Sequence, residues 1–209
     1  MPKPPSLPKL ILTPKFSTEV KLRQERGIQK IVGVDEVGRG ALAGPLIVCA
    51  IELTSEIAGI NDSKLINPPG RVILCGQIRA LAEQIRFGWA TNLEIDELGL
   101  AAAQRLAYQR ALNDIDAELV LTDNIALDRP HISKVRGDQY FYSVAAASIV
   151  AKTLRDTLML SYHQFFPDYL WSNNAGYGTK AHFDAIARHG TTELHRQSFL
   201  GNQKSPLRG

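Results

Sequence analysis

The sequence is short of cysteine and of long apolar runs. Its 209 residues include two cysteines, Cys49 and Cys75, which form no CxxC pair, and five histidines without an HExxH spacing. A disulfide framework and a zinc site of these common types are therefore not expected. No stretch approaches the roughly 20 apolar residues of a membrane-spanning helix, and the N-terminus lacks the apolar core of a secretory signal. We expect a cytoplasmic protein that does not enter a membrane.

What is present is the composition of a globular protein, with an uneven distribution of charge. Hydrophobic residues make up 44% of the chain and charged residues 22%, which suits one well-buried domain. Residues 1–30 carry seven Lys or Arg against two acids, residues 171–209 carry five against two, and the segment between them has more acids than bases. An acidic centre suits cations, and basic ends could hold a polyanion such as nucleic acid.

The first 30 residues differ in composition from the remainder. Five prolines fall within the first 14 positions and a charged run follows them. This composition predicts a disordered or loosely attached extension over residues 1–30. The folded domain is predicted to span residues 31–209.

Hydrophobic periodicity in that domain indicates strands and helices in alternation. The predicted strands lie on both sides of residues 38–45 and at 118–122 and 132–135, and the predicted helices at 72–87, 96–112, 143–162 and 180–188. Such an order is typical of an α/β domain with a mixed sheet flanked by helices.

The segment of residues 31–53 organises the sequence, and it reads IVGVDEVGRGALAGPLIVCAIEL. Asp35 and Glu36 lie where the first apolar strand ends, and Gly38, Arg39 and Gly40 follow them. Strict strand alternation would place the two acids on opposite faces, so both can serve one site only if the strand bends or ends there.

Two plainer readings of this segment stay open. One is a polar turn with solvated charges. The other is a dinucleotide phosphate loop, because Gly38, Gly40 and Gly44 nearly match its fingerprint, but that loop should open a helix and here Pro45 leads into a β-branched run.

Two further acids accompany predicted strands. Asp123 ends one strand, and Asp138 follows Gly137 just beyond another. If these strands are neighbours, four carboxylates converge at one edge, where only bound cations would relieve their repulsion. All-oxygen ligands indicate Mg²⁺ or Mn²⁺. Taken singly, Asp123 and Asp138 could equally be turn residues.

Six segments, in order, resemble the type 2 ribonucleases H, and most closely the bacterial ribonucleases HII. They read GVDEVGRGALAGPL at 33–46, DSK at 62–64, RGD at 136–138, SVAAASIVAKTLRD at 143–156, GYGTKAH at 176–182 and HRQSF at 195–199. The resemblance implies a ribonuclease H-like mixed sheet flanked by helices, with a small helical C-terminal portion. It also implies a metal-dependent endoribonuclease that cuts the RNA strand of RNA–DNA hybrids and nicks duplex DNA 5′ of single embedded ribonucleotides. The products would be 5′-phosphate and 3′-hydroxyl ends.

The resemblance also assigns roles to individual residues. It makes the four acids the family's tetrad, binding two ions of Mn²⁺ or Mg²⁺, and it makes Gly38, Arg39 and Gly40 the motif that reads the ribose 2′-hydroxyl. Tyr177 matches a tyrosine that packs on the next deoxyribose, and Lys64 a phosphate-contacting lysine. In isolation Tyr177 could be a loop anchor and Lys64 a solvated lysine. We expect a monomer whose partners are RNA–DNA hybrids and ribonucleotide-containing duplex DNA.

Other matched residues are expected to be structural. His182 and His195 lie in matched segments without a metal spacing, and the i,i+4 pair of Lys152 and Asp156 fits a helix-surface ion pair. The sequence departs from the family where Asn124 replaces a usual glycine, which puts the loop after Asp123 in doubt.

Two rival functions remain at this point. A non-catalytic nucleic-acid-binding module would use the basic ends but gains nothing from four repelling carboxylates. A nucleotide-binding oxidoreductase would require a helix directly after Gly40.

Overall fold

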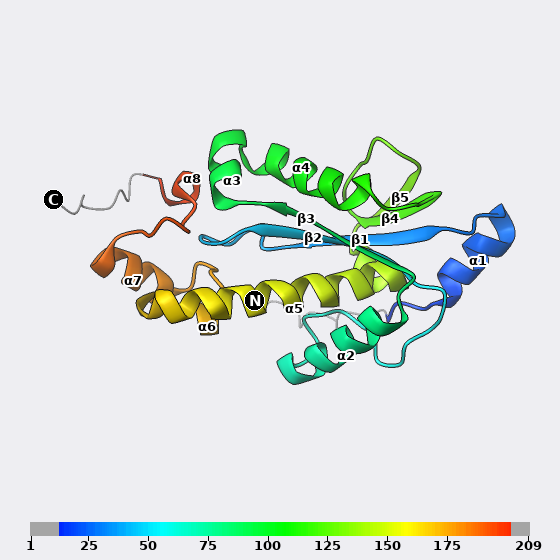
Figure 1. The fold of residues 1–209 in the computed structure, drawn as a ribbon, viewed down its shortest axis with the longest axis horizontal. Helices are drawn as coiled ribbons and strands as arrows, with labels where there is room; N and C mark the ends of the chain where they lie inside the picture. Colours follow the sequence, from blue (N-terminus) through cyan, green and yellow to red (C-terminus); the bar gives the residue numbers. More distant parts are fainter. Residues whose placement is uncertain (1–12, 202–209) are drawn as a thin grey trace, which may run out of the picture.

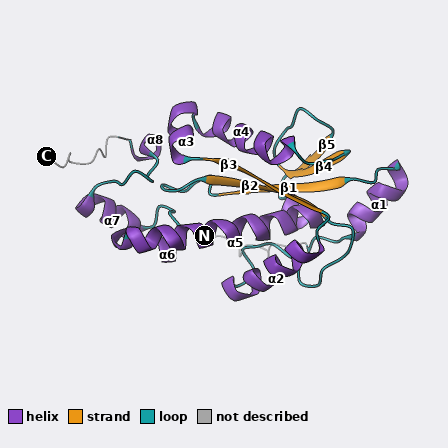
Figure 2. Ribbon diagram, in the orientation of Figure 1, coloured by secondary structure: helices purple, strands orange, loops and turns teal. Residues whose placement is uncertain are grey.

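A five-stranded mixed sheet forms the centre of the computed structural model, which describes residues 13–201 (Figures 1 and 2). The strands are β1 (Ile31–Val37), β2 (Leu46–Glu52), β3 (Gln84–Ala90), β4 (Leu119–Asp123) and β5 (His131–Lys134). Their order is β3-β2-β1-β4-β5. The first three strands are antiparallel neighbours, and β4 and β5 run parallel to β1. The predicted mixed sheet is confirmed.

Helices cover both faces of this sheet. They are α1 (Ser17–Arg26), α2 (Pro68–Leu81), α3 (Asn92–Leu98), α4 (Leu100–Asn113), α5 (Tyr142–Phe165), α6 (Trp171–Asn174), α7 (Lys180–His189) and α8 (Gln197–Leu200). In Figure 1, α4 lies on one face and α5 on the other, with α2 outside α5. Within residues 13–201, no helix combines the length and apolar character needed to span a bilayer.

The predicted helix over residues 72–87 is wrong in its second half. The helix ends at Leu81, and Gln84–Ala90 forms β3, paired antiparallel with β2. The apolar residues of this short stretch fit either period, so only the pairing with β2 selects the strand. The predicted helix over 96–112 is two helices, because Gly99, at φ +76°, interrupts it.

The predicted extension of residues 1–30 also needs correction. Residues 1–12 lie outside the described part, but residues 17–26 form α1, which is attached to the domain. The buried Glu19 carboxylate accepts hydrogen bonds from the main-chain N–H (2.9 Å) and the hydroxyl (3.0 Å) of Ser143 in the first turn of α5. Arg23 donates to the carbonyl of Leu53 at 2.7 Å. Composition did not indicate these long-range partners.

The C-terminal helices form the expected small helical portion at one end of the sheet (Figure 1). Their apolar cluster includes Trp171, Ile186 and Leu200, and it also takes in Leu42 from the loop after β1 and Met159 from α5. The C-terminal portion is therefore packed directly against the loop of residues 38–45.

Glycines let a helix main chain touch each face of the sheet. A Cβ on Gly33 in β1 would lie 2.2 Å from the carbonyl carbon of Ser143 in α5. A Cβ on Gly88 in β3 would lie 1.8 Å from the carbonyl oxygen of Ala107 in α4. Both neighbours are backbone atoms of packed helices, which cannot move aside cheaply.

We predict that Gly33→Ala lowers the free energy of unfolding by about 3 kcal/mol or more, because β1 and α5 must separate. Gly76→Ala is the matched control, since Gly76 lies inside α2 and a Cβ there would meet no atom within 4 Å. The control should gain about 0.5–1 kcal/mol from reduced chain entropy. Urea denaturation followed by circular dichroism checks both, and equal stabilities of the two variants would contradict the close contact at Gly33.

Candidate active site

The predicted acidic residues lie at the C-terminal ends of two neighbouring parallel strands. Val34 of β1 pairs with Thr122 of β4, so Asp35, Glu36 and Asp123 follow at the same edge. Asp138 is brought there by the short helical turn Gly137–Gln139, whose first N–H donates to Asp123 Oδ1 at 3.1 Å.

Asp35 and Glu36 point to opposite faces of the sheet. β1 continues to Val37, so it neither bends nor ends between them. Val32 and Val34 pack in the core on the α4 side, whereas Ile31 packs with Val144 of α5. By alternation Asp35 faces α5 and Glu36 faces α4, and the acids therefore form two halves.

Asp35 and Asp138 make up the half on the α5 side. Both are buried, and Ser148 of α5 lies close enough to Asp35 to favour its charged form. Burial, together with the negative charge of Glu36, raises the pKa of Asp35 well above its usual range. Burial and the nearby Asp62 raise the pKa of Asp138. Both shifts show that negative charge is unfavourable here without a cation.

The DSK loop borders the same half. The Asp62 carboxylate accepts from the N–H of Lys64 at 3.0 Å, which caps the turn, and Ser63 bonds the hydroxyl of Ser148 at 2.9 Å. The exposed Lys64 lies close enough for its charge to oppose the rise in the pKa of Asp138. Its side chain is therefore placed at the edge of the site.

Glu36 and Asp123 make up the half on the α4 side. Gln104 donates to Glu36 Oε1 at 2.9 Å, and the buried hydroxyl of Tyr108 donates to Oε2. Burial raises the pKa of Glu36, and the hydrogen bond from Tyr108 opposes that rise. The two acids line a cavity of about 300 Å³ together with Arg39.

The donor set fits a hard divalent cation. Every candidate ligand is a carboxylate oxygen, as Mg²⁺ and Mn²⁺ prefer, and three of the four acids have a raised pKa. In residues 13–201, no three acidic, histidine or cysteine side chains already stand close enough to form a metal-binding group. The shared site of all four acids therefore stays a prediction.

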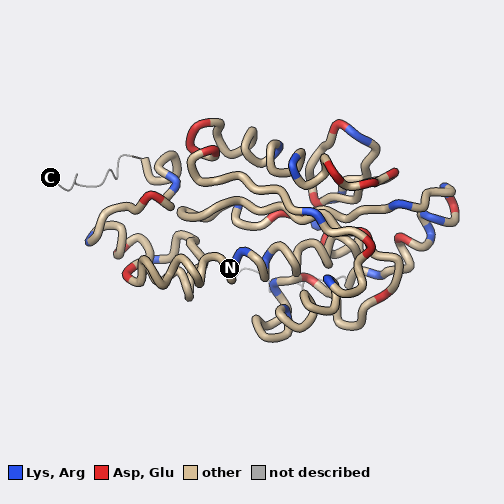
Figure 3. Tube along the Cα trace, viewed as in Figure 1, with Lys and Arg blue, Asp and Glu red and all other residues tan. Residues whose placement is uncertain are grey.

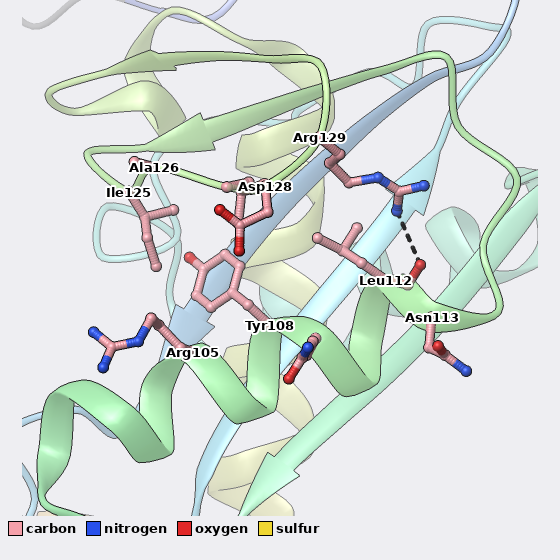
Figure 4. A pocket seen from close by; sticks show the side chains of 10 residues that line it. Arg105, Tyr108, Leu112, Asn113, Ile125, Ala126, Asp128 and Arg129 are labelled. Carbon is pink, nitrogen blue, oxygen red and sulfur yellow. Dashed lines mark hydrogen bonds between the residues drawn. The ribbon is translucent and has the colours of Figure 1, made fainter.

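A larger cavity, of about 540 Å³, lies between α4 and residues 125–129. Figure 4 shows Tyr108 between this cavity's walls, with Arg105 and Arg129 at its two sides. Arg129 donates to the carbonyl of Leu112 at 2.9 Å (Figure 4). None of the predicted carboxylate ligands lines it, but it adjoins the cavity beside Glu36, because Ile125 lines both and Tyr108 donates to Glu36.

The backbone conformation of Asn124 resolves the doubt about the loop after Asp123. Its φ is +47°, in the left-handed region. Glycine adopts this conformation freely, and asparagine is among the few other residues that tolerate it. The substitution therefore preserves the turn that follows the carboxylate.

The glycine loop of residues 38–45 does not open a helix. It runs through an isolated bridge between Ala41 and Tyr177 into β2 at Leu46. The helix that a dinucleotide-binding oxidoreductase requires after Gly40 is absent from this described segment, so that rival is wrong.

Tyr177 lies beside this loop, half-buried. The amides of Leu42 and Ala43 donate to the carbonyl of Gly176 at 2.8 and 3.2 Å, which ties the two segments together. The guanidinium of Arg155 lies 5.3 Å from the tyrosine ring centroid and the ammonium of Lys152 5.7 Å. Lys152 also forms the predicted ion pair with Asp156, at 2.7 Å.

Positive and negative residues are interspersed over most of the described chain (Figure 3). Local groups such as Lys64, Arg39 and Lys152 supply the positive charge next to the site.

Two buried histidines, His182 and His195, connect Tyr177 to the C-terminal portion through hydrogen bonds. Thr192 donates its N–H to His195 Nδ1 at 2.9 Å, so the proton of His195 is on Nε2, which faces His182 Nε2 at 3.1 Å. Trp171 donates to the same His182 nitrogen at 3.1 Å, and His182 Nδ1 donates to the Tyr177 carbonyl at 3.0 Å. The pair is neutral, and the expected structural role of both histidines agrees with these contacts.

Several residues of the site were not singled out from the sequence. Three of them lie in matched segments, and this position was the sequence signal that could have identified them: Ser148 and Arg155 in 143–156, and Arg196 in 195–199. Gln104 and Tyr108 lie on α4 in no matched segment, and only the packing of α4 on the sheet brings them to Glu36.

The neutral histidine pair predicts a dependence of stability on pH. Burial, with the nearby His182, lowers the pKa of His195 to about 4, below the value of about 6.5 in an unfolded chain. The unfolded chain therefore binds this proton first, and stability that is complete above pH 6.5 is lost as the pH falls toward 4.

We expect native protein to lose about 2 kcal/mol more than His195→Gln between pH 7.5 and pH 5. Glutamine keeps an N–H donor without a titrating group, while the carboxylates titrate in both proteins. Urea titrations at the two pH values measure the difference. Equal losses in the two proteins would contradict the buried neutral pair.

Comparison with known sequences identifies relatives over most of the chain. The ribonuclease HII family profile matches residues 32–201. The ribonuclease HII of Lactobacillus gasseri is 41% identical over 191 residues, covering 88% of this chain and 76% of that protein. That of a Synechococcus strain is 40% identical over 207 residues, covering 95% and 91%.

Comparison with solved structures supports the fold. Ribonuclease HII of Archaeoglobus fulgidus, solved in a complex with PCNA, gives a TM-score of 0.71 at 20% identity over 81% of this chain and 93% of that chain. Ribonuclease H2 of Pyrococcus horikoshii gives 0.70 at 22% identity over the same shares. Bst-RNase HIII with Mn²⁺ gives 0.62 at 19% identity, over 77% and 63%.

Proposed function

The chain belongs to the ribonuclease HII family and is a ribonuclease H, and we propose that it cuts the RNA strand of RNA–DNA hybrids and nicks duplex DNA 5′ of single embedded ribonucleotides. The ends are 5′-phosphate and 3′-hydroxyl. The observation that carries this proposal is a position: the acidic edge of the sheet, which carries Asp35, Glu36, Asp123 and Asp138, lies next to the glycine loop and Tyr177. This surface then offers carboxylates that can hold the cations for hydrolysis. It also offers main-chain N–H groups that can bind a ribose.

We infer that Asp35, Glu36, Asp123 and Asp138 hold divalent cations, two ions of Mg²⁺ or Mn²⁺. The burial of Asp35 and Asp138 and the raised pKa values of three of the four acids support this, as does the Mn²⁺ complex of the structurally similar Bst-RNase HIII. Bound cations of this kind activate a water molecule and stabilise the leaving oxygen.

The chain's own hydrogen bonds orient these acids before substrate arrives. Gln104 and Tyr108 hold Glu36, and the N–H of Gly137 holds Asp123. Donors that are already placed spare the reaction the cost of rearranging them. These carboxylates are thus fixed by the elements packed behind them.

Recognition of the ribose rests on the glycine loop. Arg39 and Gly40 are exposed, and no residue in 13–201 accepts a hydrogen bond from either main-chain N–H. A Cβ on Gly40 would meet no atom within 4 Å, so this side is open to a ligand. A 2′-hydroxyl can accept such a bond, and DNA lacks it. Tyr177 then packs on the following deoxyribose, and Lys64 contacts a phosphate.

The residues invoked for this activity come together within one copy of the chain. We propose a cytoplasmic monomer whose catalytic domain comprises residues 31–209, with α1 attached to it. Its partners are RNA–DNA hybrids and ribonucleotide-containing duplex DNA.

We predict that Asp138→Asn lowers nicking of a duplex with one ribonucleotide by roughly 10³-fold, since metal-assisted charge stabilisation is worth several kcal/mol. Asp128→Asn is the matched control, because Asp128 is an exposed acid outside the acidic edge. The assay uses 5′-labelled duplex with Mg²⁺, Mn²⁺ or chelator. Extension of the product by a DNA polymerase tests for the 3′-hydroxyl.

The outcomes separate the alternatives. Metal-dependent cutting 5′ of the ribonucleotide, lost only in Asp138→Asn, supports the proposal. Cutting of a continuous hybrid alone would discard the junction role of the glycine loop. Binding of both substrates without cutting would favour the non-catalytic nucleic-acid-binding module.

We predict that Tyr177→Ala lowers kcat/KM at a lone ribonucleotide by about tenfold more than on a continuous hybrid, because only the junction supplies the following deoxyribose on which the ring packs. A tenfold change corresponds to about 1.4 kcal/mol. Tyr177→Phe, which keeps the ring, should retain the native preference. Equal losses on both substrates would show that Tyr177 does not recognise the junction.

A further inference from the structure

Two arginines are wholly buried behind the glycine loop without acidic partners. Arg155, on α5, and Arg196, just before α8, are both 0% exposed. Among residues 13–201, no carboxylate lies within 4 Å of either guanidinium. Burial of an unpaired charge is costly unless its donors are well satisfied, so these two groups must be held by other acceptors.

Their acceptors are main-chain carbonyls of the two substrate-facing segments. Arg155 donates to Pro45 at 3.0 Å, Ala43 at 3.0 Å and Ala175 at 2.7 Å. Arg196 donates to Gly44 through two nitrogens, at 3.0 and 2.8 Å, and to Arg39 at 2.9 Å. Arg155 thus joins the glycine loop to the segment that carries Tyr177, and Arg196 joins the start of the loop to its end.

Arg155 also explains the first glycine of the motif. Gly38 has φ +87°, and a Cβ there would lie 2.2 Å from Nε of Arg155. The loop therefore lies directly on the guanidinium. The carbonyl of Arg39 accepts from Arg196, and the N–H groups of Arg39 and Gly40 have no acceptor among residues 13–201, so these donors face outward for a ligand.

We propose that Arg155 and Arg196 are positioning residues that set the preference for a ribonucleotide junction. Arg155 fixes the glycine loop against the Tyr177 segment, and Arg196 fixes the shape of the loop itself. This inference rests on the proposed function of those two segments. A planar guanidinium donates to several carbonyls at once, whereas a lysine ammonium is a single point charge. Lysine at either position keeps the positive charge, but some of the carbonyls lose their hydrogen-bond donor.

The test compares Arg155→Lys and Arg196→Lys with Ile115→Ala. Ile115 is buried in the core on the α4 side, near the start of β4 and far along the chain from both segments. It serves as a control for loss of stability alone. The three variants and the native protein are assayed at least 15 °C below their melting temperatures, with saturating Mn²⁺, on a lone-ribonucleotide duplex and on a continuous hybrid.

We expect each arginine variant to lower the ratio of kcat/KM for the lone ribonucleotide over that for the hybrid by about tenfold, the effect of about 1.4 kcal/mol. The Ile115→Ala ratio should stay within twofold of native. Arginine variants that keep the native ratio while losing as much stability as the control would overturn the proposal.

Hydrogen exchange gives a readout that does not depend on activity. Without substrate, the hydrogen-bonded amides of residues 41–44 should exchange faster in both arginine variants than in native protein or Ile115→Ala, and those of residues 175–177 should exchange faster in Arg155→Lys. Unchanged exchange there would overturn the positioning role. If Arg155→Lys does not fold, Arg196→Lys carries both measurements. A native protein that does not cut at the lone ribonucleotide contradicts the proposed function instead, and the exchange rates still decide whether the arginines hold the two segments.

Discussion

The contact between the main chains of β1 and α5 at Gly33 is the constraint on which the site depends. A side chain there would overlap Ser143, so the strand and the helix can approach this closely only at a glycine. Two residues further along β1 comes Asp35, which faces α5 close to Ser148. Two turns further along α5 comes Arg155, beneath the glycine loop. This one close contact therefore fixes the positions of both the Asp35 carboxylate and the glycine loop.

Charge is distributed around this contact in an unusual way for a protein interior. Buried carboxylates stand at the strand ends, and two buried guanidinium groups stand behind the neighbouring loop. Neither set neutralises the other by direct ion pairs among the described residues. The oxygen ligands of the acids suit cations, and the arginines donate to main-chain carbonyls. In the proposed function, each set serves a different part of a nucleic-acid substrate, the acids the reacting phosphate and the loop the ribose.

The C-terminal portion belongs to the site rather than to a separate unit. Its histidine pair bonds the carbonyl of Tyr177, and its arginine, Arg196, bonds the glycine loop. Leu42 of the loop is buried in the same apolar cluster. Polar networks of this kind are specific because a buried donor without its acceptor is costly. Substitutions in these short helices are therefore expected to affect substrate recognition.

Local patterns in the sequence were enough to predict the mixed α/β fold, the strand-loop-strand unit, the long helix from 143 and the position of acids at strand ends. Apolar periodicity and turn residues are local properties, and the six matched segments named the family. Only the tertiary structure decided that residues 84–90 form a strand, that α1 is attached through Glu19, and that Asp35 and Glu36 face opposite sides. It also decided which residues support the site: Tyr108 and Arg196 lie far along the chain from the groups they hold. Such partners depend on how helices pack on the sheet, and no local pattern carries that information.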